Sequence, residues 1–156
     1  MEQSNKSMDP FGYDLNSLIS RDFEGLAGVE TASGYWGISS YGYMDNVILL
    51  FQNNDRDNNG HMVEYHVNLL SVPNVNHKNI VKITEHFHVT DPEQTVCDMV
   101  RYNRHEFHLY ETVMNAYETG IVDVDRMEKL AEQYGILDRL REIYKLACQE
   151  YEECDG

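Results

Sequence analysis

The spacing of apolar residues changes at Asp91, and this change constrains the fold more than any other feature of the sequence. Before it, short apolar runs are separated by turn-forming residues, a pattern typical of strands. After it, apolar residues recur with the 3.6-residue period of amphipathic helices. The segment Asp91-Pro92-Glu93-Gln94 predicts a helix start, with Asp as N-cap, Pro at the first helical position and Gln able to complete a capping box. We therefore expect a sheet followed by helices.

The predicted elements give an α+β fold, a small mainly antiparallel sheet followed by a four-helix C-terminal assembly. We place strands at 46–52, 62–71 and 80–89, a reverse turn at 53–60, and a short helix at 28–36 despite its glycines. The four helices begin at Asp91, near Glu106, at Asp123 or Asp125, and near Leu137. In the second helix, core spacing is assigned to Phe107, Tyr110, Val113, Met114 and Tyr117.

Three segments are expected along the chain: a flexible lead-in at 1–17, a single domain at 18–150 and an acidic tail at 151–156. The longest apolar run, Val47–Phe51, is strand-sized, so no membrane span is predicted. The N-terminus lacks the apolar stretch of a secretion signal, which predicts a cytoplasmic protein. Three cysteines are too few for a disulfide framework and are expected to be reduced, with Cys97 as a buried thiol.

The chain is strongly acidic, with 12 Lys and Arg against 27 Asp and Glu, a net charge of −15. Residues 85–156 hold seventeen acids and seven bases, and so carry two thirds of this charge. Such a chain is repelled by phosphate, which argues against direct binding of DNA or RNA. Two interpretations remain open: a basic partner protein, or acidity that serves only solubility.

No pattern predicts catalytic, cofactor or metal chemistry. Residues 55–60 open like a calcium-binding loop, but His66 stands where the bidentate Glu is required, so a plain turn is favoured. The histidine pairs His86/His88 and His105/His108 lack a third ligand at diagnostic spacing. There is neither a nucleophile elbow nor a phosphate-binding glycine loop. We expect that the protein is not an enzyme and binds no cofactor. An enzymatic activity that is lost when Asp98 or His108 is mutated, with the fold intact, would revive the enzyme hypothesis.

The segment Val89–Tyr102 resembles the signature of AbiEi-family antitoxins. In that family the first helix of the effector domain opens with an acidic or polar start, followed in order by Glu, a basic residue, Thr, Ile or Val, Cys or Leu, and Asp. The helical pattern downstream is similar too, as is Glu30-Thr31-Ala32 followed by Gly37-Ile38 upstream. The resemblance covers about residues 25–147. It implies the family's effector fold and an antitoxin role against a nucleotidyltransferase toxin.

Two departures from the family change what is expected. Fewer than thirty residues precede the matching region, too few for the family's DNA-binding winged helix, and Gln94 replaces the usual basic residue. The first hypothesis is therefore a stand-alone antitoxin-like, non-enzymatic binding protein in the conflict between bacteria and phages. The second is a phage or mobile-element inhibitor, similar to an anti-CRISPR, whose acidic surface blocks a nucleic-acid-binding nuclease.

The predicted partner is a protein, basic or nucleic-acid-binding, with no membrane involved. The candidate contacts form two groups along the helices. The first is Asp98, Arg101 and Arg104, and the second is the acidic set Glu128, Glu132, Asp138 and Glu142. For each, the alternative is a solvated helix face or, for Asp98, a bond to neighbouring loops. Asp91 is assigned to a helix cap worth about 1 kcal/mol rather than to a contact.

Overall fold

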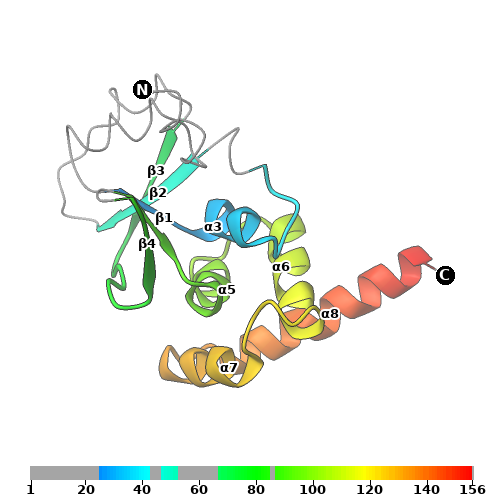
Figure 1. Cartoon of the computed structure of the whole chain (residues 1–156). Coiled ribbons are helices and arrows are strands. Elements are labelled where there is room, and N and C mark those ends of the chain that lie inside the picture. Colours follow the sequence, from blue (N-terminus) through cyan, green and yellow to red (C-terminus); the bar gives the residue numbers. More distant parts are fainter. Residues whose placement is uncertain (1–24, 43–46, 53–66, 85–86, 156) are drawn as a thin grey trace.

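Four segments of the chain, residues 25–42, 47–52, 67–84 and 87–155, are described by the computed structural model (Figure 1). Their elements follow in the order strand, helix, four strands and four helices. The strands are β1 (Gly25–Ala27), β2 (Val47–Gln52), β3 (Val67–Val72), β4 (Ile80–Thr84) and β5 (Phe87–Thr90). The helices are α3 (Val29–Trp36), α5 (Pro92–Arg101), α6 (Glu106–Glu118), α7 (Val124–Gln133) and α8 (Leu137–Asp155).

The five strands form one mixed sheet in the order β3-β2-β1-β5-β4. The pairs β1–β2 and β4–β5 are antiparallel, whereas β1–β5 and β2–β3 are parallel. The predicted α+β class is confirmed, and the prediction of a mainly antiparallel sheet is wrong. Parallel neighbours are not joined by a tight hairpin, so turn-forming residues between two strands do not fix how those strands pair. The predicted reverse turn at 53–60 lies outside the described residues.

Strand β2 is buried on both faces. Val47 and Leu49 pack with Phe87 on one side of the sheet, and Ile48 and Leu50 pack with the helical core on the other. A strand covered on both sides needs apolar residues at every position, which explains its unbroken apolar run. The strand predicted at 46–52 is thus confirmed. Of the one predicted at 62–71, β3 covers the part from Val67, and residues 62–66 lie outside the described segments.

The single strand predicted over 80–89 is wrong, because this segment contributes two strands. β4 and β5 pair antiparallel, with Ile80 opposite Thr90 and Val81 opposite Val89. The register shifts between Lys82 and Thr84. β1 was not predicted: it is three residues long, lies between β2 and β5, and is fully buried.

Glycines explain how α3 forms and ends. A Cβ on Gly28, the residue before the helix, would lie 2.4 Å from the Leu50 side chain, so a larger residue would require this side chain to shift. At the other end Gly37 has φ +78° and donates its N–H to the carbonyl of Gly34. The short helix predicted at 28–36 is confirmed.

The four C-terminal helices begin as the sequence predicts. Asp91 accepts a hydrogen bond from the backbone N–H of Gln94 at 2.8 Å, and Asp123 caps α7 in the same way through Arg126 N. His105 caps α6. α8 continues to Asp155, so the segment predicted as a tail from residue 151 is helical up to that residue. The predicted lead-in at 1–17 lies outside the described residues.

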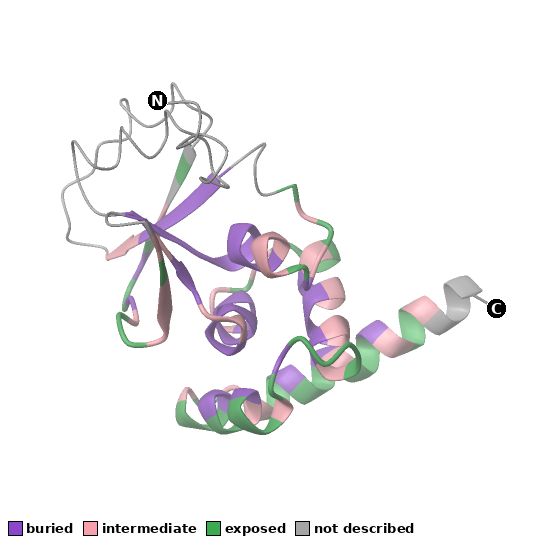
Figure 2. Cartoon of the chain, viewed as in Figure 1, coloured by how far each residue is buried: buried purple, intermediate pink, exposed green. Residues whose placement is uncertain are grey.

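Helix α5 lies at the centre of the fold (Figure 1). In Figure 1, α3 and α5 lie between the sheet and the layer formed by α6, α7 and α8. Every residue from Glu93 to Val100 is buried, whereas α8 carries many exposed residues (Figure 2). A central helix that contains Glu93, Gln94 and Asp98 requires partners for these polar groups, because an unpaired buried polar group is costly.

Candidate partner-binding surface

Asp98 is a buried member of a polar network, not a surface residue. Its carboxylate lies 3.0 Å from Arg101 Nε and accepts a hydrogen bond from Gln94 Nε2 at 2.8 Å. Burial raises the pKa of Asp98 to about 7, although the Arg101 charge opposes this increase. With 3% of the side chain exposed, Asp98 cannot contact a partner in this structure, which corrects that prediction.

Arg101 is held between aromatic rings. Its guanidinium carbon lies 4.0 Å from the centroid of the Tyr134 ring and 4.7 Å from that of Tyr102, and Nη2 donates to the carbonyl of Asn74 at 2.7 Å. These contacts join α5 to α7 and to the loop before β4. Only 13% of the side chain is exposed, so Arg101 acts inside the fold, which corrects its assignment as a partner contact.

Gln94 lies at the centre of the same network. Its Nε2 donates to Tyr134 Oη at 2.9 Å, and its Oε1 accepts from Asn79 Nδ2 at 2.9 Å. Asn76 also donates to Tyr134 Oη at 2.8 Å. These bonds connect the loop before β4 with α5 and α7. The side chain of Gln94 is therefore used by the network and not by the predicted capping box.

Arg126 adds a second connection between α7 and the start of α5. It donates to Asp91 Oδ2 at 2.9 Å and forms an ion pair with Glu93. Glu93 in turn accepts from the backbone N–H of Asp123 at 2.8 Å. Thr95 bonds to Thr90 and to the carbonyl of Asp91. The polar residues at the start of α5 thus hold helices and loops together.

Arg104 pairs across the fold with Glu30 of α3, with 2.9 Å between Nε and Oε1. The pair lies at a cavity of about 420 Å³ on the α6 side of the sheet. The cavity is also lined by Tyr41, Ile48, Asn68, Leu70, His105 and His108. Since 24% of the Arg104 side chain is exposed, it retains some contact with solvent beside this cavity.

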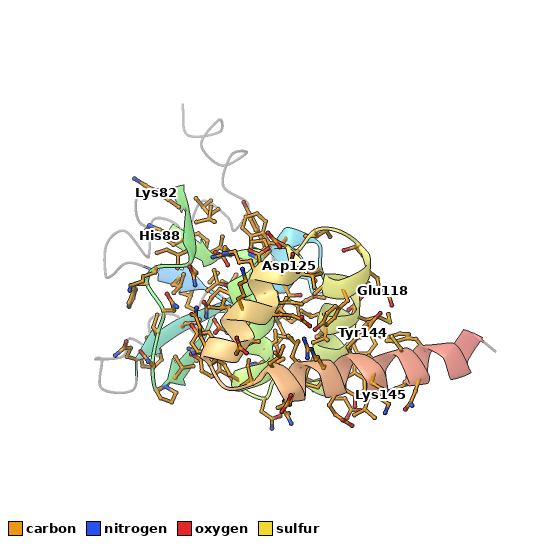
Figure 3. All side chains as sticks on the ribbon, turned by 90° about the horizontal axis from the view of Figure 1, so that it is seen from below. Lys82, His88, Glu118, Asp125, Tyr144 and Lys145 are labelled. Carbon is orange, nitrogen blue, oxygen red and sulfur yellow. The ribbon has the colours of Figure 1, made fainter. Side chains whose placement is uncertain are left out.

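Glu128 is bound by two neighbouring helices. It accepts from Tyr117 Oη of α6 at 2.6 Å and from Arg141 of α8 at 3.1 and 3.0 Å. These bonds, those from Arg141 first, lower the pKa of the Glu128 carboxyl. A parallel contact joins Tyr144 to Glu118 at 2.9 Å, and both residues are labelled in Figure 3. Glu128 therefore connects three helices, and 24% of its side chain remains exposed.

Glu132, Asp138 and Glu142 remain as exposed carboxylates. Glu132 lies near the end of α7, and Asp138 and Glu142 lie one turn apart on α8. Within the described segments none of the three forms an ion pair. Asp138 lies in the first turn of α8, where the helix dipole favours a negative charge, whereas the like charge of Glu142 at i+4 opposes it slightly. We take these three residues as the candidate acidic surface.

Phe107 was wrongly assigned to the core. It is 55% exposed, and the buried stripe of α6 is instead Leu109, Thr112, Val113 and Ala116. The sequence signal for this stripe is the spacing 109, 113 and 116, which leaves Phe107 on the opposite side. Phe107 is therefore a surface aromatic that the sequence pattern did not identify.

The remaining candidates for chemistry have structural partners. His105 accepts a hydrogen bond from Phe107 N through Nδ1, and His108 lies 3.6 Å from Glu111. Among the described residues no three His, Cys, Asp or Glu side chains gather in a way that could hold a metal ion. His86 and the residues of the calcium-like loop lie outside the described segments. Cys97 is fully buried, as predicted.

None of the helices in the described ranges is both long and apolar enough to cross a membrane. No protein-family model matches the chain, and a comparison with curated proteins finds no match.

Proposed function

We propose that this chain is a non-enzymatic binding protein that engages a basic partner protein through the acidic surface of α7 and α8. The observation that carries the proposal is the difference between two kinds of carboxylate. Glu93, Asp98 and Glu128 are each paired with an arginine of the same chain, whereas Glu132, Asp138 and Glu142 face solvent without an ion pair in the described segments.

Long-range electrostatics support a basic partner. A net charge of −15 repels nucleic acid and attracts a positively charged protein surface, which increases the rate of encounter and opposes wrong partners. Exposed carboxylates suit this role, because charges at the rim of an interface mainly affect association rate and salt dependence. The same charge also favours solubility, so binding has to be tested directly.

An antitoxin-like role follows from the resemblance to the AbiEi effector domain. The residues from Asp91 to Arg101 that resemble the signature lie in the framework around α5, so this proposal does not place the contact surface there. In this proposal the protein counters a toxin of the nucleotidyltransferase class, and its contacts come from the acidic surface rather than from the signature.

Growth rescue tests this role. Cells that express a nucleotidyltransferase toxin together with the wild-type chain should grow, and cells with the variant E132Q/D138N/E142Q should lose most of the protection. The matched control E132D/D138E/E142D keeps every charge and should protect. Failure of the wild-type chain against such toxins would contradict the antitoxin role.

A second candidate function is inhibition of a nucleic-acid-binding nuclease, and the excess of acidic residues favours it. In that case the acidic surface would occupy the basic groove that normally holds nucleic acid. Duplex DNA or RNA should then compete with the chain for its partner, and binding should weaken steeply with salt. A partner that binds nucleic acid and the chain simultaneously would contradict this candidate.

A further inference from the structure

A groove lies between the start of α6 and the C-terminal half of α8. It encloses about 480 Å³ and is lined by His105, Glu106, Phe107, Tyr110, Glu150 and Tyr151. In Figure 1 the C-terminal half of α8 extends past α6 and away from the sheet. The groove therefore lies at the edge of the helical layer (Figure 1).

Aromatic rings make up much of the groove wall. Phe107 is 55% exposed, and its ring meets His108 edge-on with 5.0 Å between the centroids. Tyr110, three residues further along α6, contributes a half-buried ring. Such an exposed phenylalanine ring provides a π face that can attract a cation.

The charges of the groove are negative. Glu106 from α6 and Glu150 from α8 are both exposed. The pKa of Tyr110 is raised by burial first and then by the negative charges of these two glutamates. The lining contains neither lysine nor arginine, although the nearby Arg139 charge opposes the increase in the pKa of Tyr110. His105 Nδ1 is already used, because it accepts a hydrogen bond from the backbone N–H of Phe107.

We propose that this groove receives an arginine side chain of the basic partner. A guanidinium stacks on aromatic faces and pairs with carboxylates, and the groove presents both kinds of group from two helices. Lysine is a poorer fit because its ammonium is a compact, strongly hydrated charge without a plane that stacks. This inference rests on the proposed function and adds to it a second contact site beside the acidic surface.

The probe for the test is a blocked hexa-arginine peptide, titrated into the full-length isotope-labelled chain at low salt. NMR shifts of backbone amides then locate the contact. We expect the amides of Phe107, Tyr110 and Tyr151 to shift, and the matching hexa-citrulline peptide, which lacks the charge, to leave them in place. Affinity at the groove should fall about threefold to tenfold in F107A.

Variants separate the cation–π contact from simple apolar contact and from general charge. F107Y keeps an aromatic face and should bind like the wild type, whereas F107L keeps apolar volume only and should resemble F107A. E106Q/E150Q should weaken binding at the groove more than the control E132Q/E142Q, which removes the same number of charges elsewhere. Because Phe107, Glu106 and Glu150 are exposed, the fold should survive, which circular dichroism of each variant checks.

The outcomes distinguish this inference from the proposed function. Shifts confined to the surface around Glu132, Asp138 and Glu142 would overturn the groove and leave the proposed function intact. Equal binding by F107L and F107Y would also overturn the groove as an arginine site. Absence of any shift at low salt would contradict both the binding of basic partners and the groove.

Discussion

The guanidinium of Arg101 lies over the ring of Tyr134, with 4.0 Å between its central carbon and the ring centroid. This contact joins α5, the buried central helix, to α7 in the outer layer. The same guanidinium group compensates the buried carboxylate of Asp98 at 3.0 Å. Asp98 and Arg101, which look like exposed charges in the sequence, are therefore part of the framework. We look for binding residues on α6, α7 and α8 instead.

Replacement of Arg101 by alanine should destabilise the fold by about 3 kcal/mol near pH 8, because a buried carboxylate loses its counter-charge. The loss should be smaller at pH 5, where Asp98 takes up a proton. Urea unfolding at pH 8 and at pH 5 measures the loss of stability at each pH. In the control R101K the charge stays but the planar stacking is lost, so an intermediate cost is expected. A cost below about 1 kcal/mol for R101A at pH 8 would contradict the network.

The stability of the wild type relative to D98N should decrease as the pH rises. The pKa of Asp98 is raised from 3.8 to about 7 in the folded chain, so the folded state holds its proton more tightly than the unfolded state. The stabilisation from that proton is complete below about pH 3.8 and is lost as the pH passes 7. One group changes stability by at most about 1.4 kcal/mol per pH unit. A constant difference between the two proteins from pH 4 to 8 would refute the raised pKa.

Two glutamates close together on α7 should behave differently. E128Q should lower the free energy of unfolding at pH 7, with about 1.5 kcal/mol from the weaker hydrogen bond of Tyr117 to an uncharged acceptor. E132Q, the matched control, should leave it within about 0.5 kcal/mol. Because the pKa of Glu128 is lowered, its contribution is present above pH 4.5 and is lost as the pH falls through the folded pKa. Equal stability of both variants at pH 7 would argue against the role of Glu128.

Cys97 should resist alkylation in the native protein. Burial raises the pKa of its thiol to about 12, and the neighbouring Asp98 charge adds to this increase. Thiols react as thiolates, so iodoacetamide at pH 8 should modify Cys97 only in denaturant. Mass spectrometry of the digested protein gives the extent at each cysteine. Half-buried Cys148 is the internal comparison. Rapid native modification of Cys97 would contradict its burial.

The helical half of the fold could be predicted because its signals are local. Asp91 and Asp123 stand directly before the helices that they cap, and the periods that follow are clear. The sheet was harder, because β1 is only three residues long and its pairing with β5 joins residues about sixty positions apart. No local pattern reports a parallel pairing of this kind.

The site was only partly predictable for a related reason. The sequence places Asp98, Arg101 and Glu128 among charged residues at helical spacing, which is also how solvated faces look. Their contacts depend on partners in other helices or loops, such as Tyr134 for Arg101 and Arg141 for Glu128. Glu132, Asp138 and Glu142 have no such partner in the described segments, and they alone of the predicted acids remain available.

The central claim, that the exposed acids of α7 and α8 bind a basic protein, is tested most directly by affinity purification with the wild type, with E132Q/D138N/E142Q and with the charge-preserving control. We expect the wild type and the control to capture basic proteins at low salt and to release them at high salt. The neutralised variant should capture little. Capture of the same proteins by the neutralised variant, unaffected by salt, would contradict the claim.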